Sequence, residues 1–399
     1  MQIDCDILIV GGGMAAARLV HELREQQYSG RIVVASREPQ MGYNRVLLPG
    51  FLAGECTLRD LCSSSHSTDE RLNVCSGVDV VGIDLMRRRA TLSDASRASF
   101  DRLVFATGSA VPVPQISGAP AERLTEFRNL DDAQRLRDLV AQSRCGAVVG
   151  GGLLGLEAAD AIAAMGLPVR LIHRGPRLMT RQLDDLGSEL LAAAMQANGV
   201  DVTLNTTIEQ MQMNPHGDHV INLSNGESYR ADFVVLATGA QPADRLAAAA
   251  GLEVDSGIVT DEYLRASRTG VYALGECANV AGARQQLVDH VNAQAAALAT
   301  TLTGEPAAVH APPVGTRLKV HNIALVAAGE MPAASQVEPG DDITIRDQAR
   351  GVYRRLGFAG NRLAGAVLFG DTAGAREIVA HLGRELDMEQ RERLAFGLV

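Results

Sequence analysis

The chain has 399 residues, of which 46% are hydrophobic and 21% charged, a composition typical of globular domains and unlike that of disordered or collagen-like chains. Its formal net charge of −10 disfavours a nucleic-acid-binding protein, which usually presents a basic face. At roughly 100–200 residues per domain, the length predicts two or three domains.

The sequence carries no pattern typical of a membrane span, a secretion signal or a metal site. No apolar run approaches the ~18–20 residues that a membrane span needs, and the first residues carry acids where a signal peptide would carry Arg or Lys. The six cysteines are scattered without a C-x-x-C pair, so zinc and iron–sulfur ligation are not expected. We therefore expect a cytoplasmic protein with reduced thiols, no metal ion and no membrane contact.

A strand, a glycine loop and a helix follow one another at residues 6–21, DILIVGGGMAAARLVH. Gly11, Gly13 and Ala16 occupy the three small positions of a G-x-G-x-x-G/A motif. The first permits a tight turn, the second lets the backbone approach a pyrophosphate, and the third lets the helix pack closely on the strand. The helix N-terminus offers free N–H groups to the phosphates, so this segment predicts a dinucleotide site.

The same pattern recurs at residues 145–161, CGAVVGGGLLGLEAADA. Each copy is followed, further along the chain, by a matching strand and turn, RLVFATGSAVP at 102–112 and FVVLATGAQP at 233–242. The small positions of the second loop are Gly150, Gly152 and Gly155, and the turn residues are Thr107, Gly108, Thr238 and Gly239. The repeat predicts two dinucleotide-binding units, one nested in the other.

The residues after the second strand of each unit indicate which nucleotide binds there. In such units an acid at this point holds a ribose hydroxyl, and Glu38 follows the strand at 31–36. The second copy instead has His173 and Arg174. Cationic side chains there suit a 2′-phosphate and hence NADPH. The alternative is that Arg174 only caps the strand and NADH binds without an acidic partner.

A third element lies at residues 268–280, RTGVYALGECANV, where a predicted strand runs into Gly275 and Glu276 before a predicted helix at about 287–302. A carboxylate at the end of such a strand can bond a ribityl hydroxyl. The N-terminus of the helix can face a flavin.

These motifs, in this order, resemble the two-dinucleotide-binding flavoproteins, the FAD-dependent pyridine nucleotide reductases. Within that family the chain is most similar to the flavin-containing N-terminal part of NAD(P)H nitrite reductase large subunits, and next to rubredoxin reductases. The stretches that carry the resemblance are GYNRVLLPGFLAGE (42–55), PRLMTRQLDDLG (176–187), YALGECA (272–278), RLKVHNIALVAAGE (317–330) and AGAVLFGD (364–371).

The resemblance implies an α/β fold with two Rossmann-like domains, one inserted in the other, and a small C-terminal α+β domain. The expected FAD-binding domain comprises 1–113 and 240–309, the NAD(P)H-binding domain 114–239, and the C-terminal domain 310–399. Within the C-terminal domain, alternating patterns predict strands over 316–370 and helix over 373–394.

The resemblance also implies roles for single residues. Gly11, Gly13 and Glu38 would hold the adenosine end of FAD, Arg45 would approach its pyrophosphate or flavin, and Gly275 and Glu276 would bind its ribityl chain. Thr107 and Gly108 would close the FAD domain. Gly152 and Gly155 would cradle the phosphates of NADH or NADPH, with Glu157 beside the nicotinamide. Lys319, the one lysine of the chain, would lie near the open side of the flavin; a structural or surface position fits it equally.

One departure from the family pattern bears on function. Disulfide reductases of the family keep a redox-active cysteine pair in the stretch matching MGYNRVLLPG at 41–50, which contains no Cys here. We therefore predict electron flow from NAD(P)H through FAD to a separate partner, either a rubredoxin- or ferredoxin-type carrier or a nitrate or nitrite reductase component. Glu157 and Lys319 would tune geometry and potential. The protein would be a monomer or homodimer.

Two other functions stay open: an NAD(P)H oxidase that reduces O2 directly, and a non-catalytic flavin redox sensor. For the carrier, one candidate docking patch is a group of arginines in the C-terminal domain, although such a group can equally be a solvated strand face. Its members are Arg346, Arg350, Arg354 and Arg355.

Overall fold

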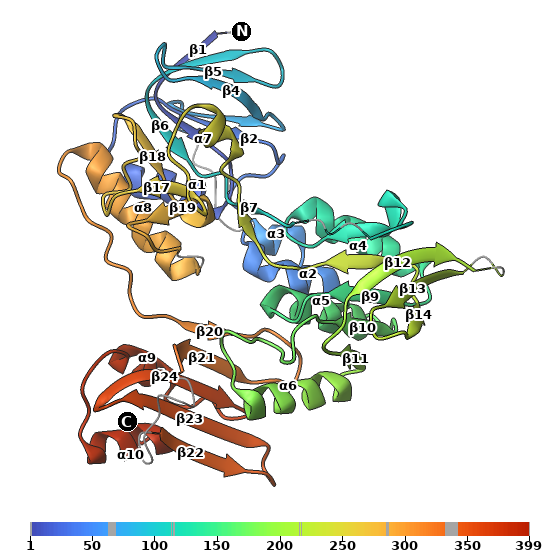
Figure 1. Ribbon diagram of the computed structural model, residues 1–399. Coiled ribbons are helices and arrows are strands. Elements are labelled where there is room, and N and C mark those ends of the chain that lie inside the picture. Colours follow the sequence, from blue (N-terminus) through green and yellow to red (C-terminus); the bar gives the residue numbers. More distant parts are fainter. Residues whose placement is uncertain are drawn as a thin grey trace. The chain divides into compact units, whose positions relative to one another are not determined.

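The computed structural model describes residues 2–62, 69–112, 114, 116–214, 216, 218–284, 287–331 and 342–398 (Figure 1). It divides into two compact units, each assembled from three stretches of chain. Unit 1 comprises Met1–Arg45, Thr57–Pro112 and Ala240–Pro312, and unit 2 comprises Val46–Cys56, Val113–Gly239 and Pro313–Val399. The three-domain boundaries expected from the sequence stay a prediction, and residue 113 at one of them lies outside the described residues.

Unit 1 is built on a seven-stranded sheet with a parallel centre, as the Rossmann-like prediction requires. Residues Ile7 to Val10 of the central strand are buried, as is typical of parallel sheets, whose two faces are both covered. The parallel strands are β1 (Gln2–Val10), β2 (Ile32–Ser36), β3 (Leu72–Ser76), β6 (Arg97–Phe105) and β18 (Val271–Ala273); β4 (Val80–Asp84) and β5 (Arg89–Leu92) form an antiparallel hairpin beside β6.

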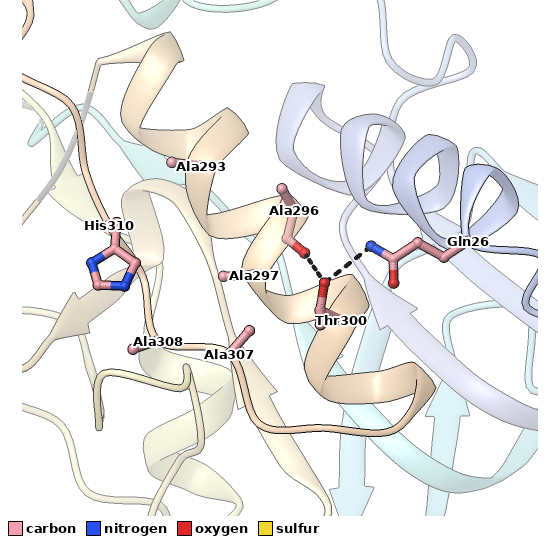
Figure 2. A pocket seen from close by; sticks show the side chains of 8 residues that line it. All are labelled: Gln26, Ala293, Ala296, Ala297, Thr300, Ala307, Ala308 and His310. Carbon is pink, nitrogen blue, oxygen red and sulfur yellow. Dashed lines mark hydrogen bonds between the residues drawn. The ribbon is translucent and has the colours of Figure 1, made fainter.

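Two helices of unit 1, α1 (Met14–Glu25) and α8 (Val288–Thr303), pack on each other. A hollow beside α8 is lined by small side chains of α8 and by residues of the 307–310 segment, and at it Gln26 Nε2 donates to Thr300 Oγ1 at 3.1 Å (Figure 2). Gln26 caps the C-terminal end of α1, so this hollow lies at the opposite end of the helix from the glycine loop. The other elements are α3 (Leu58–Leu61), β7 (Ser109–Ala110), β16 (Gln241–Pro242), α7 (Arg245–Ala249), β17 (Ile258–Thr260), η3 (Gly275–Cys277) and β19 (Ala278–Val280).

Unit 2 contains a second parallel sheet, of five strands in the order β11-β10-β9-β15-β8. This confirms that the glycine-loop pattern at 145–161 begins a second Rossmann-like unit. Its strands are β8 (Leu124–Glu126), β9 (Gly146–Val149), β10 (Val169–Ile172), β11 (Val200–Thr203) and β15 (Val234–Leu236). Its other elements are η1 (Arg45–Leu47, at its border), α2 (Leu48–Ala53), η2 (Ala121–Arg123), α4 (Leu130–Gln142), α5 (Leu153–Ala164), α6 (Asp185–Ala197) and the antiparallel β12 (Ile208–Met213), β13 (His219–Leu223) and β14 (Ser228–Arg230).

The C-terminal part of unit 2 is an antiparallel five-stranded sheet with two helices, matching the expected α+β class. The predicted helix over 373–394 is wrong in its middle, because the chain breaks at Leu382 and Gly383, where Gly383 has a φ of +76°. The elements are β20 (Gly315–Arg317), β21 (Leu325–Gly329), β22 (Asp342–Asp347), β23 (Val352–Ala359), β24 (Arg362–Phe369), α9 (Ala375–His381) and α10 (Met388–Phe396).

A buried polar network attaches this sheet to the N-terminus of α6. Asp184, the N-cap residue of α6, accepts hydrogen bonds from the Tyr353 hydroxyl at 2.5 Å and from Arg355 Nη1 at 2.8 Å. Arg355 Nε also donates to Asp342 at 2.8 Å, so one guanidinium joins two carboxylates. The Arg355 side chain is only 19% exposed, which makes these charge-assisted bonds stronger than surface ion pairs.

The network corrects the idea of a four-arginine docking patch. The Arg354 side chain is also buried, and its Nη2 donates to the carbonyl of Ala373 at 2.8 Å. Since the side chains of Arg354 and Arg355 bind groups within the domain, only Arg346 and Arg350 of the four are exposed.

Within the described part of the chain, no helix combines the length and the apolar character that crossing a membrane requires.

Arg355→Met should lower the free energy of unfolding by about 2–3 kcal/mol, because it leaves the carboxylates of Asp184 and Asp342 buried without their cation. Arg346→Met, on the adjacent strand, removes an exposed guanidinium and should change stability by less than about 0.5 kcal/mol. Urea unfolding of both variants measures the difference. Equal effects would contradict a structural role for the network.

Candidate functional site

The first glycine loop joins β1 to α1 at a very close backbone approach. Gly11 has a φ of +106°, and a Cβ at this position would lie 2.3 Å from the carbonyl oxygen of Ala106. Gly13 is the N-cap residue of α1 and no side chain caps the helix, so its first turn offers N–H groups to a ligand. Ala16 is fully buried against the strands. The loop therefore has the geometry of an anion-binding turn.

Glu38 and Arg45 meet beside this loop. The Glu38 carboxylate accepts a hydrogen bond from the Tyr43 hydroxyl at 2.6 Å, and its other oxygen accepts from Arg45 Nη2. A Cβ at Gly13 would lie 3.6 Å from Arg45 Nη2, so the guanidinium reaches the helix N-terminus. Arg45 thus lies at the helix N-terminus, where a bound phosphate would need a cation. The hydrogen bonds from Tyr43 and Arg45 fix the orientation of the Glu38 carboxylate. Sequence reasoning passed over Tyr43, although it is part of the GYNR stretch.

The Gly275–Glu276 element also reaches the N-terminal end of α1. A Cβ at Gly275 would lie 3.0 Å from the Cβ of Ala15. The Gly275 N–H donates to Oε1 of Gln294 at 2.7 Å, and Gln294 is fully buried in α8. Glu276 accepts a hydrogen bond from the hydroxyl of Ser109. Gln294 was not predicted; its signal is an amide next to the alanine-rich stretch of the helix.

The first ATG turn lies directly against the glycine loop through the Ala106 carbonyl. Thr107 Oγ1 donates to the carbonyl of Ala243 at 2.7 Å, and the carbonyl of Gly108 accepts from the N–H of Ala243 at 2.9 Å. The turn is thereby joined to the third stretch of unit 1, Ala240–Pro312. In unit 1, the residues predicted to hold FAD are gathered around one helix N-terminus.

The second glycine loop, in unit 2, repeats the same contact. A Cβ at Gly150, whose φ is +126°, would lie 2.1 Å from the carbonyl oxygen of Ala237. A Cβ at Gly155 would lie 2.0 Å from the carbonyl oxygen of Gly150, so the third small position admits only glycine here. Gly152 is the N-cap of α5, and a Cβ there would meet nothing within 4 Å. The N-terminus of α5 is therefore open to a ligand.

Thr238 and Gly239 follow Ala237 and so belong to the same end of the sheet. Gly239 is exposed with a φ of +107°, and a Cβ there would meet nothing within 4 Å. His173 and Arg174 follow β10 on the neighbouring strand. The Gly151 N–H donates to Nδ1 of His173 at 3.1 Å, so the imidazole supports the glycine loop.

The two cationic candidates after β10 differ in their surroundings. Burial, and secondarily the charge of Arg174, lowers the pKa of His173, which favours a neutral ring. Arg174 is exposed and has no ion-pair partner among the described residues. Arg177, by contrast, pairs with Asp185 at 2.9 Å. Of these two arginines, Arg174 is the one better placed to meet an added anion.

Glu157 and Lys319 contact each other in unit 2. Glu157 lies on α5, and its Oε1 accepts a hydrogen bond from the backbone N–H of Lys319 at 3.1 Å. Burial raises the pKa of Glu157 to about 7, against the lowering effect of the Lys319 N–H and charge. Lys319 is exposed, and its Nζ donates to the carbonyl of Val46 at 3.4 Å.

Cys277 lacks the surroundings of a reactive thiol. Cys277 is fully buried, burial raises its pKa, and its Sγ donates to the carbonyl of Leu274 at 3.3 Å. Cys56 follows α2 and contacts the carbonyl of Leu47 at 3.5 Å. No three His, Cys, Asp or Glu side chains in the described ranges are grouped so that they could hold a metal ion.

Comparison with known protein families matches nearly the whole chain. Residues 5–297 match the pyridine nucleotide-disulphide oxidoreductase family, and residues 313–385 match the rubredoxin NAD+ reductase C-terminal domain.

Two curated relatives illustrate the range of similar proteins. The assimilatory nitrate reductase electron transfer subunit of Bacillus subtilis (strain 168) is 31% identical over 388 residues, which cover 96% of this chain and 50% of that protein. The rubredoxin-NAD(+) reductase of Pseudomonas putida is 30% identical over 317 residues, which cover 77% of this chain and 82% of that protein. The chain spans about half the length of its nitrate and nitrite reductase relatives.

Solved structures share the fold at lower identity. A chain of the covalent putidaredoxin reductase–putidaredoxin complex superposes with a TM-score of 0.85 at 22% identity, covering 98% of both chains. The NADH:rubredoxin oxidoreductase of Clostridium acetobutylicum gives a TM-score of 0.81 at 20% identity, covering 99% of this chain and 100% of that chain. With the family match, these findings confirm the resemblance seen in the sequence: the chain belongs to the pyridine nucleotide-disulphide oxidoreductase family, whose members use FAD and NAD(P)H.

Proposed function

We propose that the chain is an FAD-dependent NAD(P)H oxidoreductase that passes electrons to a separate redox protein. The observation that carries this proposal is the pair of uncapped helix N-termini, at Gly13 and Gly152, each behind a glycine loop with the same close approach to a neighbouring turn. Two such sites in one chain suit two dinucleotides. Similar proteins named as electron transfer subunits and rubredoxin reductases support the same function.

In unit 1, the described residues fit FAD. The N–H groups of the first turn of α1 and the Arg45 guanidinium would bind the pyrophosphate, while Glu38 would accept from a ribose hydroxyl. Glu276, fixed by Ser109, would bond the ribityl chain. When bound there, FAD would supply an acceptor for the hydride of NAD(P)H that can pass the two electrons on singly.

In unit 2, the described residues fit a nicotinamide cofactor. The open first turn of α5, behind Gly152, would bind its pyrophosphate. Arg174 would meet a 2′-phosphate. Glu157, one turn further along α5, would lie beside the nicotinamide, where its charge would favour the cationic oxidised ring.

The acceptor we propose is a small redox carrier or another redox subunit rather than a thiol. The six cysteines of the chain all lie outside residues 41–50, and Cys277 is buried with a raised pKa. The solved complex of a structurally similar reductase with putidaredoxin supports a protein carrier as acceptor. The nitrate reductase electron transfer subunit that resembles this chain leaves a reductase component as a second acceptor class.

Anaerobic mixing of the FAD-loaded protein with NADH or NADPH tests the proposal directly. After mixing with at least one of the two cofactors, the yellow absorbance of the flavin should be lost. A rubredoxin or ferredoxin should then restore this absorbance faster than O2 does. Stopped-flow absorbance measures both phases. A flavin that neither cofactor bleaches contradicts the reductase function, and reoxidation by O2 alone at the carrier rate favours an oxidase.

Arg174→Glu should shift cofactor preference toward NADH by about tenfold or more in the ratio of kcat/KM values, because a charge-assisted bond to a 2′-phosphate would be lost and replaced by repulsion. Arg181→Glu makes the same charge change at an exposed position of the same loop and is the matched control. An unchanged NADPH/NADH ratio in Arg174→Glu removes this role.

Glu157→Gln should abolish a pH dependence of NAD+ binding. The pKa of Glu157 is raised to about 7, so its carboxylate ionises as the pH rises through this value and should then tighten binding of the cationic nicotinamide by about two- to fivefold. Titration calorimetry of the FAD-loaded protein at pH 6 and pH 8 measures the effect. The variant should bind NAD+ equally at both values, and NADH affinity should change little in either protein.

A further inference from the structure

Two acids of α5 bind the same segment of the C-terminal domain. Oε1 of Glu157 accepts from the N–H of Lys319 at 3.1 Å, and Oδ2 of Asp160 accepts from the N–H of His321 at 3.0 Å. Residues three apart on a helix share a face, so Glu157 and Asp160 can both reach this segment. Val320, between Lys319 and His321, is buried. The segment is therefore held on α5 by two backbone contacts.

The imidazole of His321 bridges two carboxylates. Nδ1 lies 2.5 Å from Oδ2 of Asp160, and Nε2 contacts Oε1 of Glu55, which follows α2. A neutral imidazole has one N–H and can donate to only one of them, whereas the imidazolium donates to both. The hydrogen bonds to Asp160 and then Glu55 raise the pKa of His321 above its usual value. The arrangement therefore favours the charged ring.

Both carboxylate oxygens of Asp160 accept hydrogen bonds. Its side chain is 4% exposed, and its Oδ1 accepts from Nδ2 of Asn198 at 2.9 Å. Asn198 also donates to the backbone carbonyl of His321 at 2.6 Å. The charged groups around His321 are thus Asp160 on α5, Glu55 after α2 and Lys319 on its own segment, while α6 contributes a neutral amide.

Resting on the function proposed above for Glu157, we propose that His321 is a positioning residue, whose protonated ring neutralises Asp160, fixes the 319–321 segment on α5 and thereby controls the charge of Glu157 beside the nicotinamide. Through the positive charge of His321, the C-terminal domain would then influence the charge of Glu157 at the nicotinamide site.

The electrostatics give the direction of the effect. Burial raises the pKa of Glu157, Lys319 lowers it, and the charge of Asp160 raises it. Without the His321 cation, the negative charge of Asp160 one turn away is uncompensated and should raise the pKa of Glu157 further. Removing the charge of Asp160 should have the opposite effect.

The test measures Glu157 itself, in the FAD-loaded full chain without nicotinamide cofactor. The carboxyl group of Glu157 is followed by 13C NMR with labelled glutamate and assigned by its loss in Glu157→Gln. His321→Gln should raise the midpoint of its titration by about 0.5–1 pH unit, and Asp160→Asn should lower it by a similar amount. His381→Gln is the matched control, because the His381 ring is hydrogen-bonded to the carbonyl of Glu377 in α9, away from α5, and it should leave the midpoint unchanged.

If the buried Asp160→Asn variant does not fold, Glu55→Gln replaces it in the test, because Glu55 is 54% exposed and its carboxylate contacts the same imidazole. It should lower the pKa of His321, followed through its ring resonances. The stability difference between the native protein and His321→Gln should be largest at pH values below about 6.5, the ordinary histidine value, and vanish as the pH rises through the raised pKa.

An unshifted Glu157 titration in His321→Gln overturns the coupling. The midpoint of NAD+ binding against pH, measured by calorimetry, should move upward together with the Glu157 titration. If the NMR midpoint moves and the binding midpoint does not, the coupling stands and the placement of Glu157 beside the nicotinamide fails.

Discussion

In both Rossmann-like units, steric repulsion at the first glycine of the loop decides which residue can join the strand to the helix. In each Rossmann-like unit, the first glycine of the loop sits so close to a neighbouring carbonyl that a Cβ would lie 2.3 Å from Ala106 or 2.1 Å from Ala237. Only a residue without a side chain permits this approach, and both glycines have positive φ. The turn lets each helix start immediately after its strand. Because no side chain caps either helix, its first N–H groups stay available.

In unit 2, helix α5 begins at the glycine loop and also contacts the C-terminal domain. Its first turn follows Gly152, and its next turn presents Glu157 and Asp160 to the backbone of the 319–321 segment. A second attachment joins Asp184 of the α6 cap to Tyr353 and Arg355. Both α5 and the N-terminus of α6 are therefore bonded to residues from the C-terminal part of the chain. These contacts shield polar groups of that part from water.

Much of the architecture could be predicted from local patterns. Glycine spacing, the repeated ATG turn and the apolar strand preceding each loop depend on residues near one another in sequence, and their geometry follows from sterics. The helix over 373–394 was predicted wrongly as continuous, because Gly383 breaks it with a positive φ that composition does not reveal. The arginine patch failed for another reason: two of its four members turn inward to acids or carbonyls that are distant in sequence.

The two nucleotide-binding units, their order and the missing cysteine pair could be read from the amino-acid sequence, since each depends on residue type at short spacing. Which charged side chains contact one another depends instead on how distant segments pack. Glu38 with Arg45, Arg355 with Asp184, and His321 with Asp160 are contacts whose energies depend on distance and burial. The same side chains exposed to water would interact weakly, and packing between distant segments is what removes that water.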